Sequence, residues 1–301
     1  MTTIFEAEQA LRLGLEGLYE PSEAHAIGRI VLEQVLGLSH SRLLMVDKDT
    51  LLSPEQEADL QRLEEKLLSG VPLQYALGLA PFAQYELRVA PGVLIPRPET
   101  EELVALILEE WSDRLAPRAL DVGTGSGCIA YALSAGLEPR ACVEALELSE
   151  EALGVARANF DDLTRLYGRH VQLHRGDVLS LCQGPPSGAP YDLIVSNPPY
   201  IHPREAEQMT PQVLGHEPSM ALFAPETDPL VFYRALAQMA REGWSALEGE
   251  IWAELNPLYA EETLSVMQEL LSERSPRGEL LRDLSGKQRF VRIILDTQAR
   301  S

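Results

Sequence analysis

Four consecutive residues in the second half of the chain could hold a planar nitrogen group for chemistry. Asn197, Pro198, Pro199 and Tyr200 follow an apolar run over residues 191–196 that is typical of a buried strand. Pro199 has no N–H and a fixed φ, and it excludes the helical region for Pro198, so the loop is stiff and extended. The Asn197 side-chain oxygen and the Pro198 carbonyl oxygen can then accept both N–H groups of an amide or an amine. An ordinary loop is the alternative, but the residues upstream favour a site that presents a nitrogen for reaction.

A glycine-rich turn precedes this tetrad, between a predicted strand and a predicted helix. Its glycines allow the backbone to approach a ligand closely and to turn tightly. It is not a phosphate-binding P-loop, because no Gly-Lys-Ser/Thr follows, and a cysteine stands where the dinucleotide-binding fingerprint has its third glycine. A purely structural turn is the alternative. The turn consists of Gly123, Thr124, Gly125, Ser126 and Gly127.

Three further candidate residues follow the next two predicted strands. Glu147 comes directly after a strand predicted over residues 141–146, where a carboxylate can accept both hydroxyl groups of a ribose. Capping of the helix that begins after Ser149 is the alternative role. Asp177 and Val178 follow the next strand, where an acid and an apolar neighbour could bracket the edge and face of an adenine. Because open α/β sheets bind ligands at the carboxyl ends of their strands, these features predict one shared site.

Strands alternate with helices in the part of the chain that carries these residues. This alternation predicts an α/β fold with a doubly wound, mostly parallel sheet. The tail predicts an antiparallel hairpin at the sheet edge, which brings the total to seven strands. The predicted strands lie near residues 118–121, 141–146, 171, 193, 251, 278–281 and 290–295, and the predicted helices span 128–135, 150–159 and 229–241.

The beginning of the chain predicts a small helical domain. Apolar residues recur at helical spacing over residues 11–18 and 27–38. Ser53, followed by proline and then by Gln56, is a well-formed helix start. No catalytic residue types cluster there, so packing or partner recognition is the expected role.

A short linker follows, in which residues 85–89 alternate as a strand and Pro91-Gly92 forms a turn, so a hairpin is expected. We therefore expect three parts: a helical substrate-recognition domain over residues 1–72, a hairpin linker over 73–96 and a catalytic domain over 97–301.

Composition excludes several classes of protein. A protein with a formal net charge of −21 is not expected to have the basic surface that nucleic-acid binding requires. No apolar run reaches the length of a membrane span, and the N-terminus has no signal-peptide pattern, so no membrane association is expected. Cys128, Cys142 and Cys182 show no paired spacing, as in reduced thiols of a cytoplasmic protein. The six histidines show no metal-ligand pattern, so no metal is expected.

The motifs together resemble a known family. The glycine turn, Glu147 and the Asn-Pro-Pro-Tyr tetrad look like those of class I S-adenosylmethionine-dependent methyltransferases that act on amino groups. Further segments are similar to the peptide chain release factor glutamine methyltransferases, and the similarity extends from about residue 70 to the C-terminus. These segments are residues 70–75 (GVPLQY), 93–101 (VLIPRPETE), 217–222 (EPSMAL) and the tail that contains Arg289.

The resemblance implies a Rossmann-like fold and a set of site residues. It implies that S-adenosylmethionine is bound by the five residues of the glycine turn, with Glu147, Asp177, Val178 and Asn197. It also implies that the tetrad holds the glutamine side-chain amide of the Gly-Gly-Gln loop of a class I release factor, with Asn197, Pro198 and Tyr200 catalytic. Family members commonly carry aspartate at the position of Glu147 and a glycine in the hairpin near Ala83.

Other functions share parts of this pattern. A glutamine methyltransferase of a ribosomal protein would use the same tetrad, and the sequence separates the two targets poorly. An adenine-N6 DNA methyltransferase also grips an amine with Asn-Pro-Pro-Tyr, but it needs a basic face for DNA. A binding module without activity is disfavoured, because every expected ligand position is filled.

Overall fold

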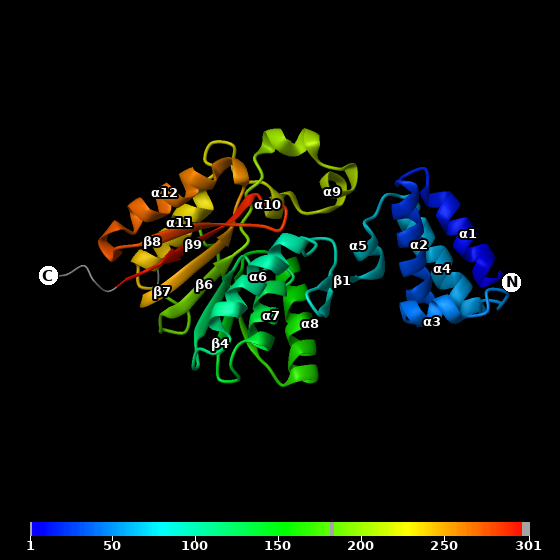
Figure 1. The fold of residues 1–301 in the computed structure, drawn as a ribbon, viewed down its shortest axis with the longest axis horizontal. Coiled ribbons are helices and arrows are strands. Elements are labelled where there is room, and N and C mark those ends of the chain that lie inside the picture. Colours follow the sequence, from blue (N-terminus) through cyan, green and yellow to red (C-terminus); the bar gives the residue numbers. More distant parts are fainter. Residues whose placement is uncertain (1, 181–183, 297–301) are drawn as a thin grey trace. The chain divides into compact units, whose positions relative to one another are not determined.

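The computed structural model describes residues 2–180 and 184–296, in two compact units (Figure 1). The first unit is Met1–Leu79 with Thr210–His216, and the second is Ala80–Met209 with Glu217–Ser301. Cys128 and Cys142 are free thiols, and Cys182 lies outside the described residues. Within the described ranges, no helix has both the length and the apolar character needed to cross a membrane.

The first unit consists of short helices around an aliphatic core. Leu11, Leu15, Val31 and Leu67 are among its fully buried residues, as the helical spacing predicts. The helix that starts after Ser53 has the predicted capping box, in which serine and Gln56 each accept the other's backbone N–H. The helices are α1 (Ile4–Leu15), α2 (Pro21–Leu36), α3 (His40–Met45), α4 (Pro54–Leu68), α5 (Leu73–Leu77) and α9 (Pro211–His216).

The second unit is built on a seven-stranded sheet in the described part of the chain, which confirms the predicted fold class. The strand order is β5-β4-β3-β6-β7-β9-β8; the first five of these pair in parallel, and β9 is antiparallel to both of its neighbours. Chain order reverses between β3 and β6, which is the switch point where such sheets bind ligands. The strands are β3 (Arg118–Val122), β4 (Cys142–Glu147), β5 (Val171–Arg175), β6 (Tyr191–Ser196), β7 (Ser245–Glu254), β8 (Arg277–Arg282) and β9 (Gln288–Ile294).

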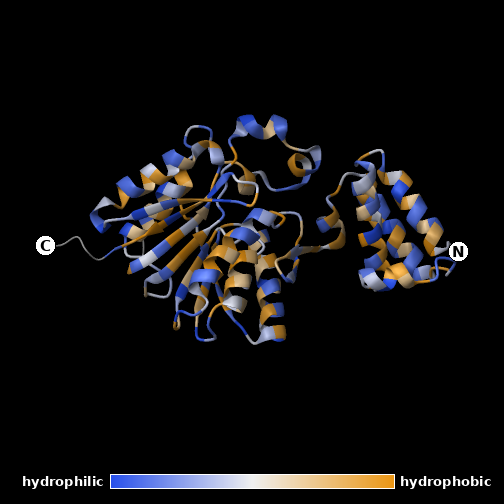
Figure 2. Cartoon of the chain, in the orientation of Figure 1, coloured by the Kyte–Doolittle hydropathy of each residue, from blue (hydrophilic) through white to orange (hydrophobic). Residues whose placement is uncertain are grey.

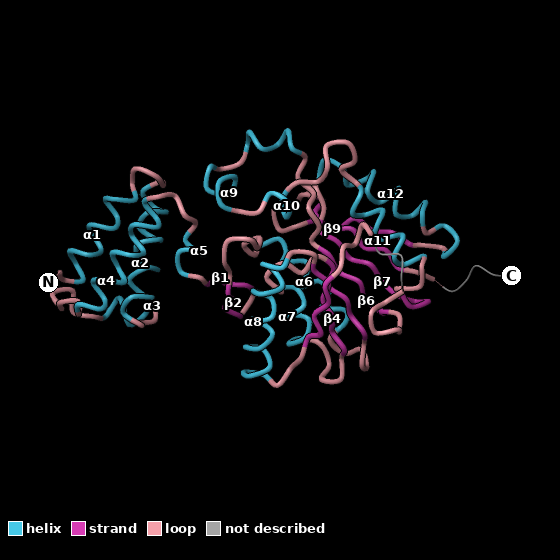
Figure 3. The backbone as a smooth tube through the Cα atoms, turned by 180° about the vertical axis from the view of Figure 1, so that it is seen from behind, coloured by secondary structure: helices cyan, strands magenta, loops and turns pink. Residues whose placement is uncertain are grey.

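Helices cover both faces of this sheet, as the view from behind shows (Figure 3). One core packs strand residues against α6, α7 and α8, and the other packs them against α11 and α12. Hydrophobic residues are accordingly concentrated along the strands between the helix layers (Figure 2). The helices are α6 (Pro98–Trp111), α7 (Cys128–Gly136), α8 (Glu150–Tyr167), α11 (Val231–Arg241) and α12 (Ala260–Leu270), with the short α10 (Ser219–Leu222), η1 (Pro203–Gln208), η2 (Pro257–Tyr259) and η3 (Ser272–Arg274).

The predicted linker was partly wrong in its details. Its first residues form α5, which buries Tyr75 and Ala76, and the hairpin consists of β1 (Leu79–Phe82) and β2 (Tyr85–Arg88). The hairpin turns at Ala83, with φ of 51°, and the predicted turn at Pro91-Gly92 is a separate one beyond β2. An alanine in this left-handed conformation gave no turn signal, because glycine is the residue that normally occupies it.

Candidate active site

A cavity of about 360 Å³ lies at the carboxyl ends of β3, β4, β5 and β6, in the second unit. Its volume is within the range of small-molecule sites. Most of the residues predicted from the motifs line it, whereas Gly127 and Tyr200 are not among the lining residues. The predicted residues that line it are Gly123, Thr124, Gly125, Ser126, Glu147, Asp177, Val178, Asn197, Pro198 and Pro199.

The three glycines of the turn differ in role. All have positive φ, and a Cβ on Gly123 or Gly125 would meet no atom within 4 Å, so these two expose bare backbone to open space. A Cβ on Gly127 would lie 2.7 Å from the ring of Phe160. Gly127 therefore lets α8 pack closely against the start of α7, while the first two glycines leave room in the cavity.

Asp121, which is fully buried, anchors the glycine turn through hydrogen bonds. Its Oδ2 accepts hydrogen bonds from the Thr124 hydroxyl (2.5 Å) and the Ala130 backbone N–H (3.1 Å), and its Oδ1 has no partner. Burial raises the pKa of Asp121 to about 7. Asp121 is not among the site residues predicted from the sequence, although an acid near the end of a buried strand and before a glycine turn is itself a signal.

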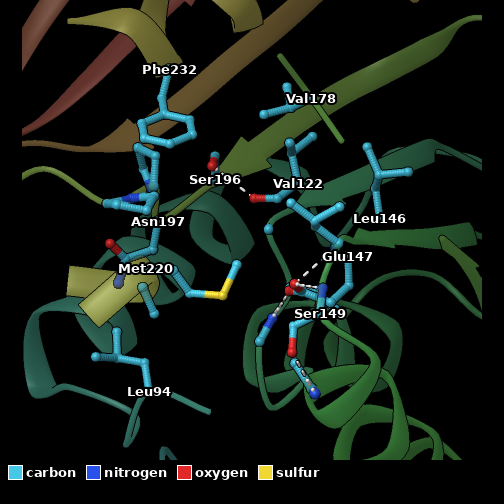
Figure 4. Close-up of a pocket in the computed structure, with 18 of the residues that line it drawn as sticks. Leu94, Val122, Leu146, Glu147, Ser149, Val178, Ser196, Asn197, Met220 and Phe232 are labelled. Carbon is cyan, nitrogen blue, oxygen red and sulfur yellow. Dashed lines mark hydrogen bonds between the residues drawn. The ribbon is translucent and has the colours of Figure 1, made fainter. Parts of the chain in front are cut away.

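Glu147 reaches across from β4 to the glycine turn. Its Oε2 accepts from the backbone N–H of Gly125 at 2.8 Å, and its Oε1 accepts from Leu148 (2.8 Å) and Ser149 (2.9 Å) (Figure 4). The extra methylene of glutamate, relative to aspartate, gives the side chain this reach. The two bonds to Oε1 use both of its lone pairs, whereas Oε2 keeps one, so these bonds orient Glu147 and leave Oε2 able to accept from a ligand.

Asp177 and Val178 form the next part of the wall. Asp177 accepts from the Leu179 backbone N–H at 2.9 Å and from the Ser180 hydroxyl at 3.0 Å, which fixes the turn after β5. Val178 packs partly into the core beneath. The two residues thus present a polar and an apolar contact side by side.

The opposite wall contains apolar residues that the sequence analysis did not identify. Figure 4 shows Leu94, Met220 and Phe232 on the same side of the cavity as Asn197, and Glu147 on the other side. These three come from a loop before α6, from α10 and from α11. Leu94 and Met220 lie in segments 93–101 and 217–222, which carry the family resemblance, but only the tertiary fold brings these three side chains to one cavity.

The tetrad is held by a chain of hydrogen bonds that ends on a buried carboxylate. Asn197 Nδ2 donates to Thr100 Oγ1 (2.9 Å), and Thr100 donates to Glu254 Oε2 (2.8 Å). The Tyr200 hydroxyl donates to the other oxygen of Glu254 at 2.6 Å. Asn256 supports the loop through its Nδ2, which donates to the Tyr200 carbonyl at 3.3 Å.

An ion pair connects two segments at the edge of the cavity. Arg97 Nη2 lies 2.6 Å from Glu217 Oε1, and the second oxygen of Glu217 accepts from the Ile95 backbone N–H at 3.2 Å. Glu217 is buried and Arg97 lines the cavity. The pair therefore fixes the segment before α10 to the loop before α6.

Among residues 2–180 and 184–296, no group of three or more His, Cys, Asp or Glu side chains is arranged to hold a metal ion.

The fold and the family models place the chain among the methyltransferases. Residues 92–222 match the model of the methyltransferase small domain, and residues 6–78 match that of the PrmC N-terminal domain. The chain belongs to the release factor glutamine methyltransferase family, since it is 41% identical to the release factor glutamine methyltransferase of Bacteroides thetaiotaomicron over 93% of this chain and 96% of that protein.

A second relative agrees with this assignment. The release factor glutamine methyltransferase of Deinococcus radiodurans is 38% identical over 88% of each chain. Among solved structures, the release-factor-specific protein-(glutamine-N5) methyltransferase of Alicyclobacillus acidocaldarius is 26% identical, covers 70% of this chain and 99% of its own, and has a TM-score of 0.42.

Proposed function

We propose that this protein transfers a methyl group from S-adenosylmethionine to the side-chain amide nitrogen of the glutamine in the Gly-Gly-Gln loop of class I peptide chain release factors. The observation that carries the proposal is the placement of Asn197 and Pro198 in one cavity with the glycine turn and Glu147. The family assignment over nearly the whole chain supports the choice of substrate.

The cavity residues fit S-adenosylmethionine. Gly123 and Gly125 have no side chain to fill the space beside the glycine turn, so part of S-adenosylmethionine can lie there. Glu147 would accept the ribose hydroxyls, and Asp177 with Val178 would contact the adenine edge and face. S-adenosylmethionine would supply an electrophilic methyl group: its sulfur–carbon bond breaks as the nitrogen–carbon bond forms, the sulfonium leaves as the neutral thioether S-adenosylhomocysteine, and the nitrogen loses one proton to water.

The tetrad would supply orientation for a weak nucleophile. An amide nitrogen is unreactive because its lone pair is delocalised into the carbonyl group. Asn197 Oδ1 and the Pro198 carbonyl would accept its two N–H groups and favour a pyramidal nitrogen as positive charge develops there. Pro199 keeps the loop rigid, and Tyr200 would pack against the amide while its hydroxyl anchors the loop on Glu254.

The proposed partner is a protein of the translation apparatus, so we place the reaction in the cytoplasm. A net charge of −21 argues against recognition through nucleic acid. The helical residues 1–72 would recognise this protein partner.

The direct test is methyl transfer from labelled S-adenosylmethionine to a purified class I release factor. A factor with its loop glutamine replaced by alanine and a duplex DNA are the controls. Label on the wild-type factor alone supports both the reaction and the target residue. Label on neither factor, with cofactor still bound, rejects the release factor as substrate and directs the test to ribosomal proteins.

A further inference from the structure

We infer that Glu254 is a positioning residue that determines which way the Asn197 side-chain amide faces. The inference rests on the proposed function, since it concerns how the same site prepares its acceptor for the substrate N–H. The structural basis is the hydrogen-bond chain from Glu254 through Thr100 to Asn197.

The location of Glu254 already separates it from ordinary surface acids. It ends β7, is fully buried, and accepts the hydroxyl groups of two residues at the active site, Thr100 and Tyr200. Burial raises the pKa of Glu254, while the hydrogen bonds from Tyr200 and Thr100 and the charge of Arg289 oppose that rise and favour the carboxylate. A third hydrogen bond, from the Tyr233 hydroxyl to the Glu254 carbonyl oxygen at 3.0 Å, fixes the end of the strand.

The direction of the hydrogen bonds follows from the chemistry of the groups. An ionised carboxylate only accepts, so the single hydroxyl hydrogen of Thr100 must point to Glu254. Thr100 can then only accept from Asn197, and Asn197 must turn its Nδ2 toward Thr100. The amide oxygen Oδ1 is therefore the atom that Asn197 can offer to a substrate. Together with the Pro198 carbonyl oxygen, it can accept the two N–H groups of the substrate amide.

A neutral amide at position 254 would remove this polarity. In Glu254→Gln the new side chain presents one oxygen and one NH₂ group, so either Thr100 or Tyr200 faces a donor. If Thr100 accepts from Gln, its hydroxyl can donate to Asn197 and the asparagine amide can reverse. If Tyr200 faces the NH₂ group, its hydroxyl must accept instead of donating to a carboxylate, which weakens the anchor of the loop. In both cases the substrate nitrogen is held less well.

The same strand provides a matched control. Glu250 is also buried on β7 and is also bonded to α6, through Trp111 Nε1 at 3.4 Å, but Trp111 does not line the cavity, whereas Thr100 does. Its other partners include Arg292 Nε at 3.0 Å. Glu250→Gln therefore removes a buried charge of comparable position without touching the tetrad.

The test measures turnover, cofactor affinity and the Asn197 amide in full-length protein. Glu254→Gln should lower kcat about 30-fold, with the dissociation constant of S-adenosylmethionine within about 3-fold of wild type, because misplaced reacting groups cost up to about 100-fold. Thr100→Val should have the same effect, and Thr100→Ser, which keeps the hydroxyl, should recover most of the rate. Glu250→Gln should lower the melting temperature while leaving kcat near wild type.

A second readout does not depend on activity. The Asn197 side-chain N–H signals in an NMR spectrum, assigned by their loss in Asn197→Ala, should exchange slowly with solvent in wild type and faster in Glu254→Gln and Thr100→Val. If Glu254→Gln does not fold, Thr100→Val carries the test. Wild-type kcat together with unchanged exchange in the folded variants would overturn the inference. Absence of methylation by the wild-type protein would instead reject the proposed substrate, and the exchange measurement would still decide the role of Glu254.

Discussion

Asn197 is the residue at which the proposed chemistry can be separated most cleanly from binding. Asn197→Ala removes one of the two acceptors for the substrate N–H groups while leaving the glycine turn and Glu147 intact. We expect kcat to fall about 100-fold and the affinity for S-adenosylmethionine to change by less than about 3-fold, because the lost contact acts on the reacting nitrogen. Steady-state methylation and calorimetric cofactor titration measure the two effects.

A histidine close to the tetrad provides the control for this experiment. His202 caps η1 by accepting the backbone N–H of Arg204 at 3.2 Å, so His202→Ala alters the same region without removing an acceptor in the cavity. Its kcat should stay within about 3-fold of wild type. A large loss of cofactor affinity with normal turnover at saturation in Asn197→Ala would contradict the assigned role.

Asp121 links the glycine turn to the pH dependence of stability. Its pKa is raised from 3.8 to about 7 by burial, so the folded protein keeps the proton over a range in which the unfolded chain has lost it. Folding stability therefore decreases as pH rises from about 4 to about 7, by about 4 kcal/mol in total, and is constant above that range. The cost is absent below pH 4, where both states are protonated.

Asp121→Asn should remove this dependence, because asparagine is neutral at every pH in the range. The free energy of unfolding of the variant minus that of the wild type should increase between pH 4 and pH 7 and then level off. Urea titrations at a series of pH values measure the difference. A difference that is independent of pH would mean that Asp121 is ionised in the folded protein.

Whether a site residue can be predicted from the sequence depends on how its side chain reaches the cavity. Asn197 and Glu147 directly follow predicted strands, so their position at the carboxyl edge of a parallel sheet could be inferred from chain order alone. Glu254 also ends a strand and could have been recognised by the same rule. Thr100 and Met220 stand in segments 93–101 and 217–222, which carry the family resemblance, but the packing of α6 and α10 is what brings their side chains to the cavity.

At the level of elements, the alternation of strands and helices was enough to predict the sheet and its antiparallel edge hairpin. Helix lengths were less predictable: α8 extends to Tyr167, beyond the predicted end at residue 159. The resemblance implies a hairpin near Ala83, but alanine itself gives no signal for a turn with a positive φ there. Local signals thus determine the order of the elements, and tertiary contacts adjust their ends and tight turns.

The glycine turn before α7 serves two purposes: Gly127 allows close packing, and Gly125 leaves room in the cavity. Gly127→Ala places a methyl group against Phe160 and forces alanine into a left-handed conformation, so it should lower the free energy of unfolding by about 2–4 kcal/mol. Gly125→Ala has the conformational cost alone, about 1 kcal/mol, but its methyl group projects into open space beside the cavity. We therefore expect Gly125→Ala to weaken cofactor binding more than Gly127→Ala.

Chemical denaturation and cofactor titration of the two variants measure this separation. Phe160→Leu provides a check on the packing argument, because a smaller side chain should relieve part of the clash in a double variant with Gly127→Ala. Equal losses of stability in the two alanine variants would show that contact with Phe160 contributes nothing.

At the scale of the whole molecule, the residues of the proposed chemistry all belong to one of the two units. The cavity is lined by residues of the second unit, and residues 6–78, which match the N-terminal family model, lie in the first. The first unit has its own aliphatic core, and none of its described residues is among those that line the cavity. This division supports separate roles, with methyl-donor binding in the sheet unit and protein recognition in the helical unit.

Removal of residues 1–79 tests that division. The remaining chain keeps the sheet, both of its cores and the whole cavity lining, so its affinity for S-adenosylmethionine should stay within about 5-fold of the full-length value, because the contacts that bind the ligand are unchanged. Its kcat/KM for a release factor should fall at least about 100-fold, since a contact surface worth about 3 kcal/mol or more is lost. Segment 210–216, which groups with the removed unit, is replaced by a short glycine-serine linker in a second variant, so that its exposure does not obscure the result. Methylation of the factor with an unchanged KM would assign recognition to the sheet unit instead, and loss of cofactor binding would show that the sheet unit needs the helices to fold.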